Sequence, residues 1–308
     1  MSVPHFLGIA EVPPEQITRL LDRAGELKQA RRSGAVPLQG RSLVQIFEKP
    51  SLRTRLSFDV AMAELGGHSV YLSPAEVGLG RRESVADVAR VVARMVDAVV
   101  LRTYAHETVE EFARHSAIPV VNGLSDLEHP CQALADVFTI RERKGLRNVT
   151  AAYIGDGNNV AHSFMLCAAK AGLSVRVATP EGYGPQPHIV ELARAAAAAS
   201  GARLEIGNDP ASAVGGADVV YTDVWTSMGQ EAEYERRRRA FQGFQVNAAL
   251  LARAKPDAIV LHDLPAHRGE EVTDEVIDGP QSAVFEQAEN RLHAQKAVLC
   301  WLMGEAVR

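Results

Sequence analysis

Residues 43–56 read LVQIFEKPSLRTRL, and this stretch decides the fold. It opens with an apolar run, Leu43–Phe47, that has the length and composition of a buried strand. A short polar segment follows, and then Leu56, Val60 and Ala63 recur at the three-to-four spacing of a helix. A strand that leads at once into a helix is the unit of a parallel sheet, because parallel strands need a crossover connection.

The same alternation continues along almost the whole chain, with clear helical spacing between Val85 and Met95. It predicts an α/β protein whose parallel sheets are covered by helices on both faces. A chain of 308 residues suits two domains, and the strand series before and after about residue 145 indicate two doubly wound sheets. The other strand-like runs are Ser69–Leu72, Ala98–Leu101, Val120–Val121, Ala151–Ile154, Val175–Ala178, Val219–Thr222 and Ala258–Leu261.

The composition excludes several classes of protein. Hydrophobic residues make up 46% and charged residues 23%, and the net charge of −5 gives no general attraction to nucleic acid. We interpret the basic run Arg236–Arg239, beside Glu231, Glu233 and Glu235, as the solvated face of a helix. No apolar run reaches membrane-spanning length, so we expect no membrane partner.

The three cysteines, Cys131, Cys167 and Cys300, lie far apart in apolar helical stretches. This spacing favours buried thiols in a reducing compartment over disulfides or a zinc site. The first residues lack the basic and apolar pattern of a signal or transit peptide. We therefore expect a cytoplasmic protein without a bound metal.

Ser51 follows the first strand and is a natural N-cap for the helix behind it. The free amides of Leu52, Arg53 and Thr54 would then form an anion site, because a helix start offers N–H groups and a positive dipole end. The guanidinium of Arg53 and the hydroxyl of Thr54 add donors for phosphate oxygens. A capped helix with exposed arginines is the plain alternative. A Walker-type loop is absent, which argues against a nucleoside triphosphate.

Two further features lie where ligands bind in open α/β sheets, beyond the carboxyl ends of strands. Arg102 follows the run Ala98–Leu101, and His129 and Gln132 lie three residues apart at a helix start, where they can share a face. An imidazole N–H can polarise a carbonyl oxygen, and an amide can bind an NH2 group. A surface arginine and a structural histidine are the alternatives.

The second half of the chain offers groups for an amine. Gly155 and Gly157 follow a strand, but Val160 stands at the third glycine of the dinucleotide fingerprint, so a nicotinamide-dependent oxidoreductase is a minor alternative. Asp223, at a strand end, can pair with an ammonium group. The turn Ser227–Gly229 either closes over a ligand or is a simple loop.

Ser51-Leu52-Arg53-Thr54-Arg55 and His129-Pro130-Cys131-Gln132 together resemble the carbamoyl-phosphate signature of the aspartate and ornithine carbamoyltransferases. Leu52 stands where that family usually has threonine, but its backbone N–H remains. The block Asp223–Glu231 resembles the ornithine branch, and the resemblance extends from about Phe47 to Leu302. It implies transfer of a carbamoyl group from carbamoyl phosphate to the side-chain amine of L-ornithine. The products are L-citrulline and phosphate, as in arginine biosynthesis or the urea cycle, and no metal or organic cofactor takes part.

The resemblance assigns carbamoyl phosphate to the first domain, with Arg102 and His129 as catalytic residues that draw charge onto the carbonyl oxygen. Linking helices would join the domains, and the C-terminal helix would return to the first one. The domains would then be residues 1–135 plus 283–308, and residues 145–275. The expected carbamoyl-phosphate site consists of Ser51, Leu52, Arg53, Thr54, Arg102, His129, Gln132, Leu264 and Arg291.

The resemblance also assigns the amino-acid end of ornithine to Asn159, Asp223, Ser227 and the backbone of Met228. Asp263 replaces the cysteine of the family's His-Cys-Leu-Pro motif. A carboxylate there favours the protonated ammonium, whereas the nucleophile is the neutral amine, unless Asp263 itself takes the proton as a catalytic base. Two alternatives follow: a carbamoyltransferase for another amine, such as acetylornithine or putrescine, or a catalytically weak ligand-binding relative.

The resemblance further implies a homotrimer or an assembly of trimers. In this family the loop after the run Ser69–Leu72 lends a glutamine or histidine to the neighbouring subunit's active site. The matching residue here is Gly78, which offers only its backbone, so Arg81 or Arg82 would have to substitute.

We expect Asp263→Cys to be faster than the natural sequence at neutral pH, because the carboxylate stabilises the unreactive ammonium. The natural sequence should gain activity more steeply as pH rises. Citrulline formation measured from pH 6 to pH 9 tests this. A cysteine variant that is no faster and has the same pH profile would contradict it.

Overall fold

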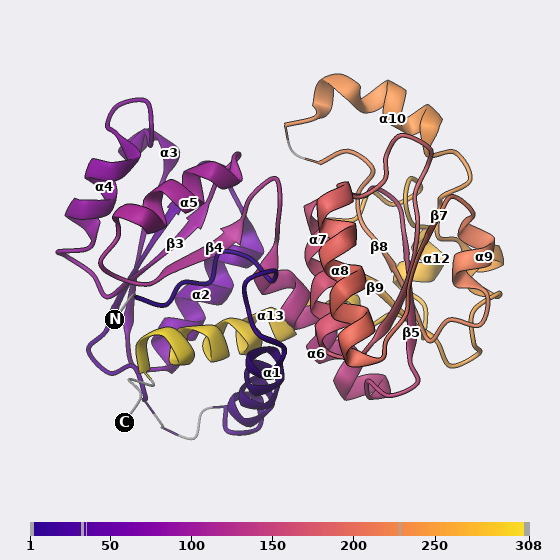
Figure 1. Cartoon of the computed structure of the whole chain (residues 1–308), viewed down its shortest axis with the longest axis horizontal. Helices are drawn as coiled ribbons and strands as arrows, with labels where there is room; N and C mark the ends of the chain where they lie inside the picture. Colours follow the sequence, from indigo (N-terminus) through magenta and orange to yellow (C-terminus); the bar gives the residue numbers. More distant parts are fainter. Residues whose placement is uncertain (1–2, 32–33, 35, 228, 305–308) are drawn as a thin grey trace. The chain divides into compact units, whose positions relative to one another are not determined.

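The computed structural model describes residues 3–31, 34, 36–227 and 229–304. The chain divides into two compact units, Met1–Ala135 with Asn290–Arg308, and Asp136–Glu289. Each unit contains one parallel sheet with helices on both faces (Figure 1). Within the described residues, no helix is long and apolar enough to cross a membrane.

The sheet of the first unit has the strand order β2-β1-β3-β4, and all its strands are parallel. The chain therefore steps from β1 to β2 on one side and then to β3 on the other. This reversal places a topological switch point at the carboxyl ends of β1 and β3, where open sheets bind ligands. The strands are β1 (Ser42–Phe47), β2 (His68–Leu72), β3 (Ala98–Arg102) and β4 (Val120–Leu124).

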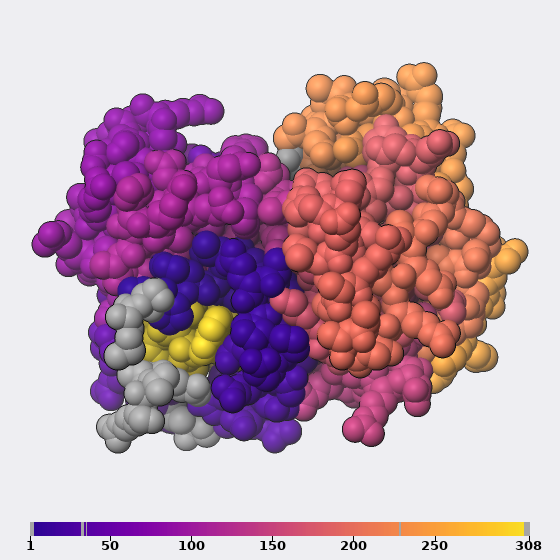
Figure 2. All heavy atoms as spheres, viewed as in Figure 1, coloured from indigo at the N-terminus to yellow at the C-terminus, as the bar shows by residue number. Residues whose placement is uncertain are grey.

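A core of buried aliphatic and aromatic side chains holds this unit together. Val44 and Ile46 of β1 and Val99 of β3 pack with Val88 and Phe112 from two helices on one face of the sheet. In Figure 2 a yellow surface of C-terminal residues shows between the indigo atoms of the N-terminal segment and α1. The helices are α1 (Pro14–Gln29), α2 (Leu52–Glu64), α3 (Pro74–Val77), α4 (Val85–Val92) and α5 (His106–His115), with the first part of α6 (Pro130–Lys144), the last part of α13 (Val284–Leu299) and the π-helical turn η2 (Cys300–Gly304).

The sheet of the second unit has the order β7-β6-β5-β8-β9, again all parallel. Its switch point lies at the carboxyl ends of β5 and β8. The strands are β5 (Thr150–Ile154), β6 (Ser174–Ala178), β7 (Leu204–Gly207), β8 (Val219–Thr222) and β9 (Ile259–His262), and the helices are α7 (Asn159–Lys170), α8 (Pro187–Ser200), α9 (Pro210–Val214), η1 (Glu231–Glu233), α10 (Tyr234–Ala240), α11 (Ala248–Leu251) and α12 (Asp274–Ile277).

The α/β class and the two parallel sheets confirm the sequence prediction, and every predicted run overlaps a strand, although β9 begins one residue after the predicted Ala258. One strand, β7, was not predicted. Its residues are half-buried and exposed in turn, and it lies at the edge of its sheet. A four-residue edge strand of this kind carries too few apolar residues to stand out from a loop.

The interpretation of Arg236–Arg239 was wrong at one position. Arg236, Arg238 and Arg239 are exposed on α10, but Arg237 is 7% exposed. Its guanidinium donates from Nη1 to Asp156 Oδ2 at 2.9 Å and to the carbonyl oxygen of Trp225 at 3.1 Å. The buried carboxyl of Asp156 needs a charged partner, and Arg237 is that partner. The charges around residues 231–239 could not predict this pairing, because Asp156 lies 81 residues earlier in the chain.

We expect Gly157→Ala to destabilise the protein by about 1–3 kcal/mol, the usual cost of overpacking. An added Cβ would lie 2.2 Å from the backbone nitrogen of Pro185 and 2.7 Å from the carbonyl oxygen of Tyr183. These are backbone atoms, which cannot move away from the added Cβ as easily as the end of a flexible side chain could. Gly207→Ala is the matched control, because nothing lies within 4 Å of its added Cβ. Equal urea midpoints for the two variants would contradict the expectation.

Candidate functional site

The start of α2 has the geometry of an anion site. Ser51 is extended at φ −157°, and its hydroxyl accepts from the Thr54 backbone N–H at 3.2 Å. The same hydroxyl donates to Thr54 Oγ1 at 3.0 Å. The first turn contains no acidic residue, and Leu52 is 75% exposed, so its apolar side chain leaves the turn uncovered. The backbone N–H groups of this turn and the helix dipole therefore favour an anion.

Arg291, from α13, connects this turn to the start of α6. Its guanidinium donates from Nη2 to Thr54 Oγ1 at 2.9 Å and from Nη1 to Gln132 Oε1 at 3.0 Å. All three side chains are buried, with Arg291 3% exposed. The structure thus brings together three residues that the sequence analysis placed in one site although they lie up to 237 positions apart.

Arg102 and His129 complete this cluster within the first unit. Arg102 ends β3 and is 5% exposed, and His129 precedes α6 and is 2% exposed. Burial, together with the positive charges of Arg291, Arg102 and Arg53, holds the pKa of His129 well below its usual value. The imidazole is therefore neutral, and a neutral ring with one N–H can donate to a carbonyl oxygen without adding charge. Leu264, which the sequence analysis placed in the same site, belongs to the second unit.

The second unit gathers a different set of groups at its own switch point. Asp223 follows β8 and is 4% exposed. Its Oδ1 accepts from the Val224 backbone N–H, and its Oδ2 accepts from Asn158 Nδ2, both at 2.7 Å. Asn158 is also the N-cap of α7. The sequence analysis named Asn159, which is the first residue of α7, and missed Asn158. An asparagine directly before an apolar helical pattern is the signal that points to it.

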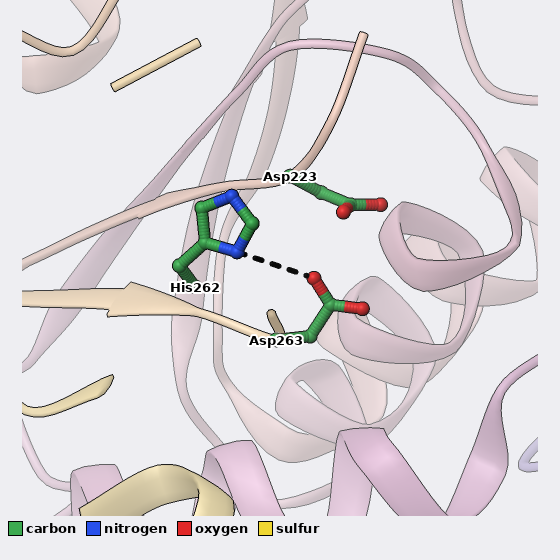
Figure 3. Close-up of side chains that lie close together, drawn as sticks. All are labelled: Asp223, His262 and Asp263. Atoms are coloured by element: carbon green, nitrogen blue, oxygen red, sulfur yellow. Dashed lines mark ion pairs between the residues drawn. The ribbon is translucent and has the colours of Figure 1, made fainter. Parts of the chain in front are cut away.

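Asp263 directly follows β9, and its carboxyl group lies beside that of Asp223. Figure 3 shows both carboxyl groups next to the ring of His262. Carboxylate oxygens of the two aspartates and a ring nitrogen of His262 lie within 4.8 Å of one another. Burial, and then the neighbouring carboxyl of Asp263, raise the pKa of Asp223 well above its usual value, while His262 and the Asn158 amide act in the opposite direction.

His262 is fully buried, and both of its ring nitrogens are engaged. Nε2 lies 3.0 Å from Glu271 Oε1, and Nδ1 accepts from the Leu264 backbone N–H at 2.9 Å. That second bond holds Leu264 in the left-handed region, at φ 59°. Nδ1 also lies 3.5 Å from Asp263 Oδ1, the contact that is dashed in Figure 3. Since the Leu264 N–H points at Nδ1, this nitrogen carries no proton, and the contact is not an ion pair.

In the part of the chain that the structure describes, two groups of side chains are close enough together to be considered for a metal. The first is Asp223, His262 and Asp263, and the second is His267, Glu270 and Glu271. In the first group His262 has no lone pair to spare. In the second, Glu271 Oε1 accepts from His262 and from the His267 backbone N–H, and Glu270 contacts the Tyr234 hydroxyl. We therefore interpret both groups as hydrogen-bonded clusters.

The turn after β8 contains the last two predicted ligands of ornithine. Ser227 is half-buried, and its backbone N–H donates to Gln230 Oε1 at 3.1 Å. Met228 lies outside the described residues. The position of Ser227 after the switch-point strand agrees with the sequence analysis.

Comparison with known proteins gives two matches that divide the chain. Residues 4–142 match the family described as the aspartate/ornithine carbamoyltransferase carbamoyl-P binding domain, and residues 147–302 match its Asp/Orn binding domain. The chain belongs to the aspartate/ornithine carbamoyltransferase family.

Relatives within this carbamoyltransferase family are similar over nearly the full length. The ornithine carbamoyltransferase of Pyrococcus abyssi is 54% identical over 302 residues, which cover 97% of this chain and 95% of that protein. The protein named anabolic ornithine carbamoyltransferase of Pyrococcus furiosus is also 54% identical, over 97% of this chain and 96% of its own length.

Solved structures of the family agree with the fold described above. The ornithine carbamoyltransferase structure from Pyrococcus furiosus has a TM-score of 0.96 and 52% identity, and it covers 100% of this chain and 99% of its own. The structure from Thermus thermophilus has a TM-score of 0.88 and 48% identity, and it covers 98% of this chain and 99% of its own.

We expect His129 to make this carbamoyltransferase less stable as pH falls below about 6.5, the ordinary pKa of histidine. Below this pH, His129 binds a proton in the unfolded chain but not in the folded chain, because folding lowers its pKa. Protonation therefore favours the unfolded chain. The loss is up to about 1.4 kcal/mol per pH unit. Urea unfolding from pH 7.5 to pH 5.5 should show a shallower loss for His129→Asn, with the same substitution at the exposed His188 as control. Parallel curves for all three proteins would contradict this.

Proposed function

We propose that the chain is an ornithine carbamoyltransferase, which transfers the carbamoyl group of carbamoyl phosphate to the side-chain amine of L-ornithine. The products are L-citrulline and phosphate. The observation that carries the proposal is the buried cluster in which Arg291 bonds Thr54 and Gln132 behind the capped start of α2. The names of the Pyrococcus abyssi and Pyrococcus furiosus relatives support it.

The proposed phosphate ligands are Ser51, Arg53, Thr54 and Arg102, together with the backbone N–H of Leu52. They supply a helix start and guanidinium groups, both of which bind phosphate well. Arg291 belongs to the same site. Gln132 would hold the carbamoyl NH2 group, and its Oε1 is already fixed by Arg291.

The carbonyl oxygen would gain negative charge in a tetrahedral transition state. Thr54, Arg102 and the neutral His129 are the proposed donors to it, and such donors act most strongly where charge develops. Their burial removes competing water, so each hydrogen bond is stronger than it would be at the surface. The backbone of Leu264 would take part at the carbamoyl end.

Asp223, Asn159, Ser227 and Met228 are the proposed ligands for ornithine, and Asp263 is the proposed base. The ammonium loses one proton to Asp263, and the nitrogen lone pair then forms a bond to the carbonyl carbon. The C–O bond to phosphate breaks, and its electron pair leaves with the phosphate. A second proton passes from nitrogen to the departing phosphate, so the step balances.

The pair of carboxyls at Asp223 and Asp263 favours one alternative, a catalytically weak relative that binds ligand, since carboxylates stabilise the unreactive ammonium. A carbamoyltransferase for acetylornithine or putrescine is the other. Assays of carbamoyl phosphate with each of the three amines decide among these. Product from ornithine well above product from the other two supports the proposal, and no product from any amine contradicts it.

We further propose a homotrimer, alone or assembled further, in the cytoplasm and in the biosynthesis of arginine. Leu52, Leu56 and Val70 lie on α2 and on the edge strand β2 and are 75%, 56% and 39% exposed, which is typical of an association surface. The three buried thiols suit a reducing compartment. Light scattering tests the trimer through the mass in solution, which should be three times 33.3 kDa.

We expect Arg53→Gln to lower turnover about 100-fold, since one donor to a developing charge contributes on the order of 3 kcal/mol. The urea midpoint should change little, because Arg53 is only half-buried at the helix start. Arg90→Gln is the control: Arg90 pairs with Asp87 on the exposed face of α4. The assignment of Arg53 fails if both variants turn over alike.

A further inference from the structure

The carboxyl groups of Asp223 and Asp263 have oxygens within 4.8 Å of each other, and Asp223 is only 4% exposed, so their closeness sets a condition on their protonation. An ionised carboxylate has only acceptor atoms, so two ionised carboxylates repel and cannot bond to each other. One proton, held by either carboxyl, removes this repulsion and lets the two groups form a hydrogen bond. The pair then carries a single negative charge.

We propose that Asp223 and Asp263 share one proton in the ligand-free protein, and that a primary ammonium group of the amine substrate displaces this proton to solvent. That the amine is ornithine rests on the function proposed above. The shared proton itself does not, because it follows from side chains of this chain alone.

The raised pKa belongs to the pair of carboxyls, and the hydrogen bonds around Asp223 place the proton on Asp263. Both oxygens of Asp223 already accept hydrogen bonds, from the Val224 backbone N–H and from Asn158 Nδ2. A carboxyl that accepts two N–H donors is favoured in its charged form. Asp263 is the less enclosed partner, with its side chain 13% exposed, so an arriving ammonium can reach it.

The ionisable side chains around the two aspartates do not provide a positive charge that could replace the shared proton. Both ring nitrogens of His262 are already engaged, because Nδ1 accepts from the Leu264 backbone N–H and Nε2 lies 3.0 Å from Glu271 Oε1. Arg237 is paired with Asp156 and Glu233. The phenols Tyr153 and Tyr221 have pKa values raised well above the usual range, first by burial and then by nearby aspartates, and these include Asp136. Their hydroxyls donate to Asn158 Oδ1 and Asp136 Oδ2.

A substrate ammonium is the natural replacement for the proton. It carries one positive charge and three N–H donors, so it can bond to two carboxylates at once. Once it is bound, both aspartates are ionised and one proton has been released. By linkage, the affinity for the amine should fall about tenfold for each unit by which the pH drops while the free pair is protonated.

The test is infrared spectroscopy of the whole protein between pH 5 and pH 9. A protonated carboxyl has a carbonyl stretch that an ionised one lacks. We expect such a band at pH 6 that Asp263→Asn removes, since the amide keeps the size and a donor but has no titratable proton. Asp257→Asn, at an exposed carboxyl whose pKa is lowered by Lys144, should keep the band. Burial raises the pKa of Asp156 to about 6, so its own band must survive in Asp263→Asn.

Adding L-ornithine with inorganic phosphate should abolish the Asp263-dependent band and release about one proton per protein, measured with an indicator dye. The inference is overturned if no band at pH 6 depends on Asp263, or if the band persists at saturating ornithine. If the variant does not fold, loss of the wild-type band on adding ornithine still distinguishes these outcomes. A missing band in a protein that forms citrulline sinks this inference alone, whereas a band without citrulline formation sinks the proposed function alone.

Discussion

The bonds from Arg291 to Thr54 and Gln132 hold the first unit's site in shape. One buried guanidinium fixes the hydroxyl at the start of α2 and the amide at the start of α6. Removing this buried charged donor would take one hydrogen bond from each of two buried acceptors, and such a loss costs more than the bonds themselves contribute. The positions of Ser51 and His129 depend on these same two helix starts. The site is therefore a set of helix ends fixed by a single side chain.

The two units use burial in opposite ways. The first gathers guanidinium groups around a neutral histidine, and the second gathers carboxyls around Asp223. Like charges held close together destabilise a folded chain unless a ligand of opposite charge arrives. The first arrangement suits a phosphate and the second an ammonium. The like charges at both switch points lower the stability of the folded chain but prepare it to bind a ligand of opposite charge. Such a trade between stability and function is common at functional sites.

The sequence predicted what is set locally. Strands such as β1 were predicted from short apolar runs, and the N-cap at Ser51 was predicted from the residue type and its position before a helical pattern. The contact of Asn158 with Asp223, the burial of Arg237 and the closeness of Asp223 to Asp263 were not predicted, because each depends on a partner brought close only by the fold. Arg291 was placed through family resemblance, since no local pattern links it to Thr54. Features set by neighbouring residues could be predicted from the sequence, whereas contacts between residues far apart along the chain could not.

The discontinuity of the first unit has a consequence for how the protein is made. Chains emerge from the ribosome from the N-terminus onward, and domains usually fold as they appear. Arg291, which bonds Thr54, comes after all of residues 136–289. While the second unit is being synthesised, the nascent first unit has its strands but lacks this arginine. The buried cluster at the start of α2 can therefore form only after the second unit has been synthesised, and a ribosome that stalls before residue 291 leaves the cluster without its guanidinium group.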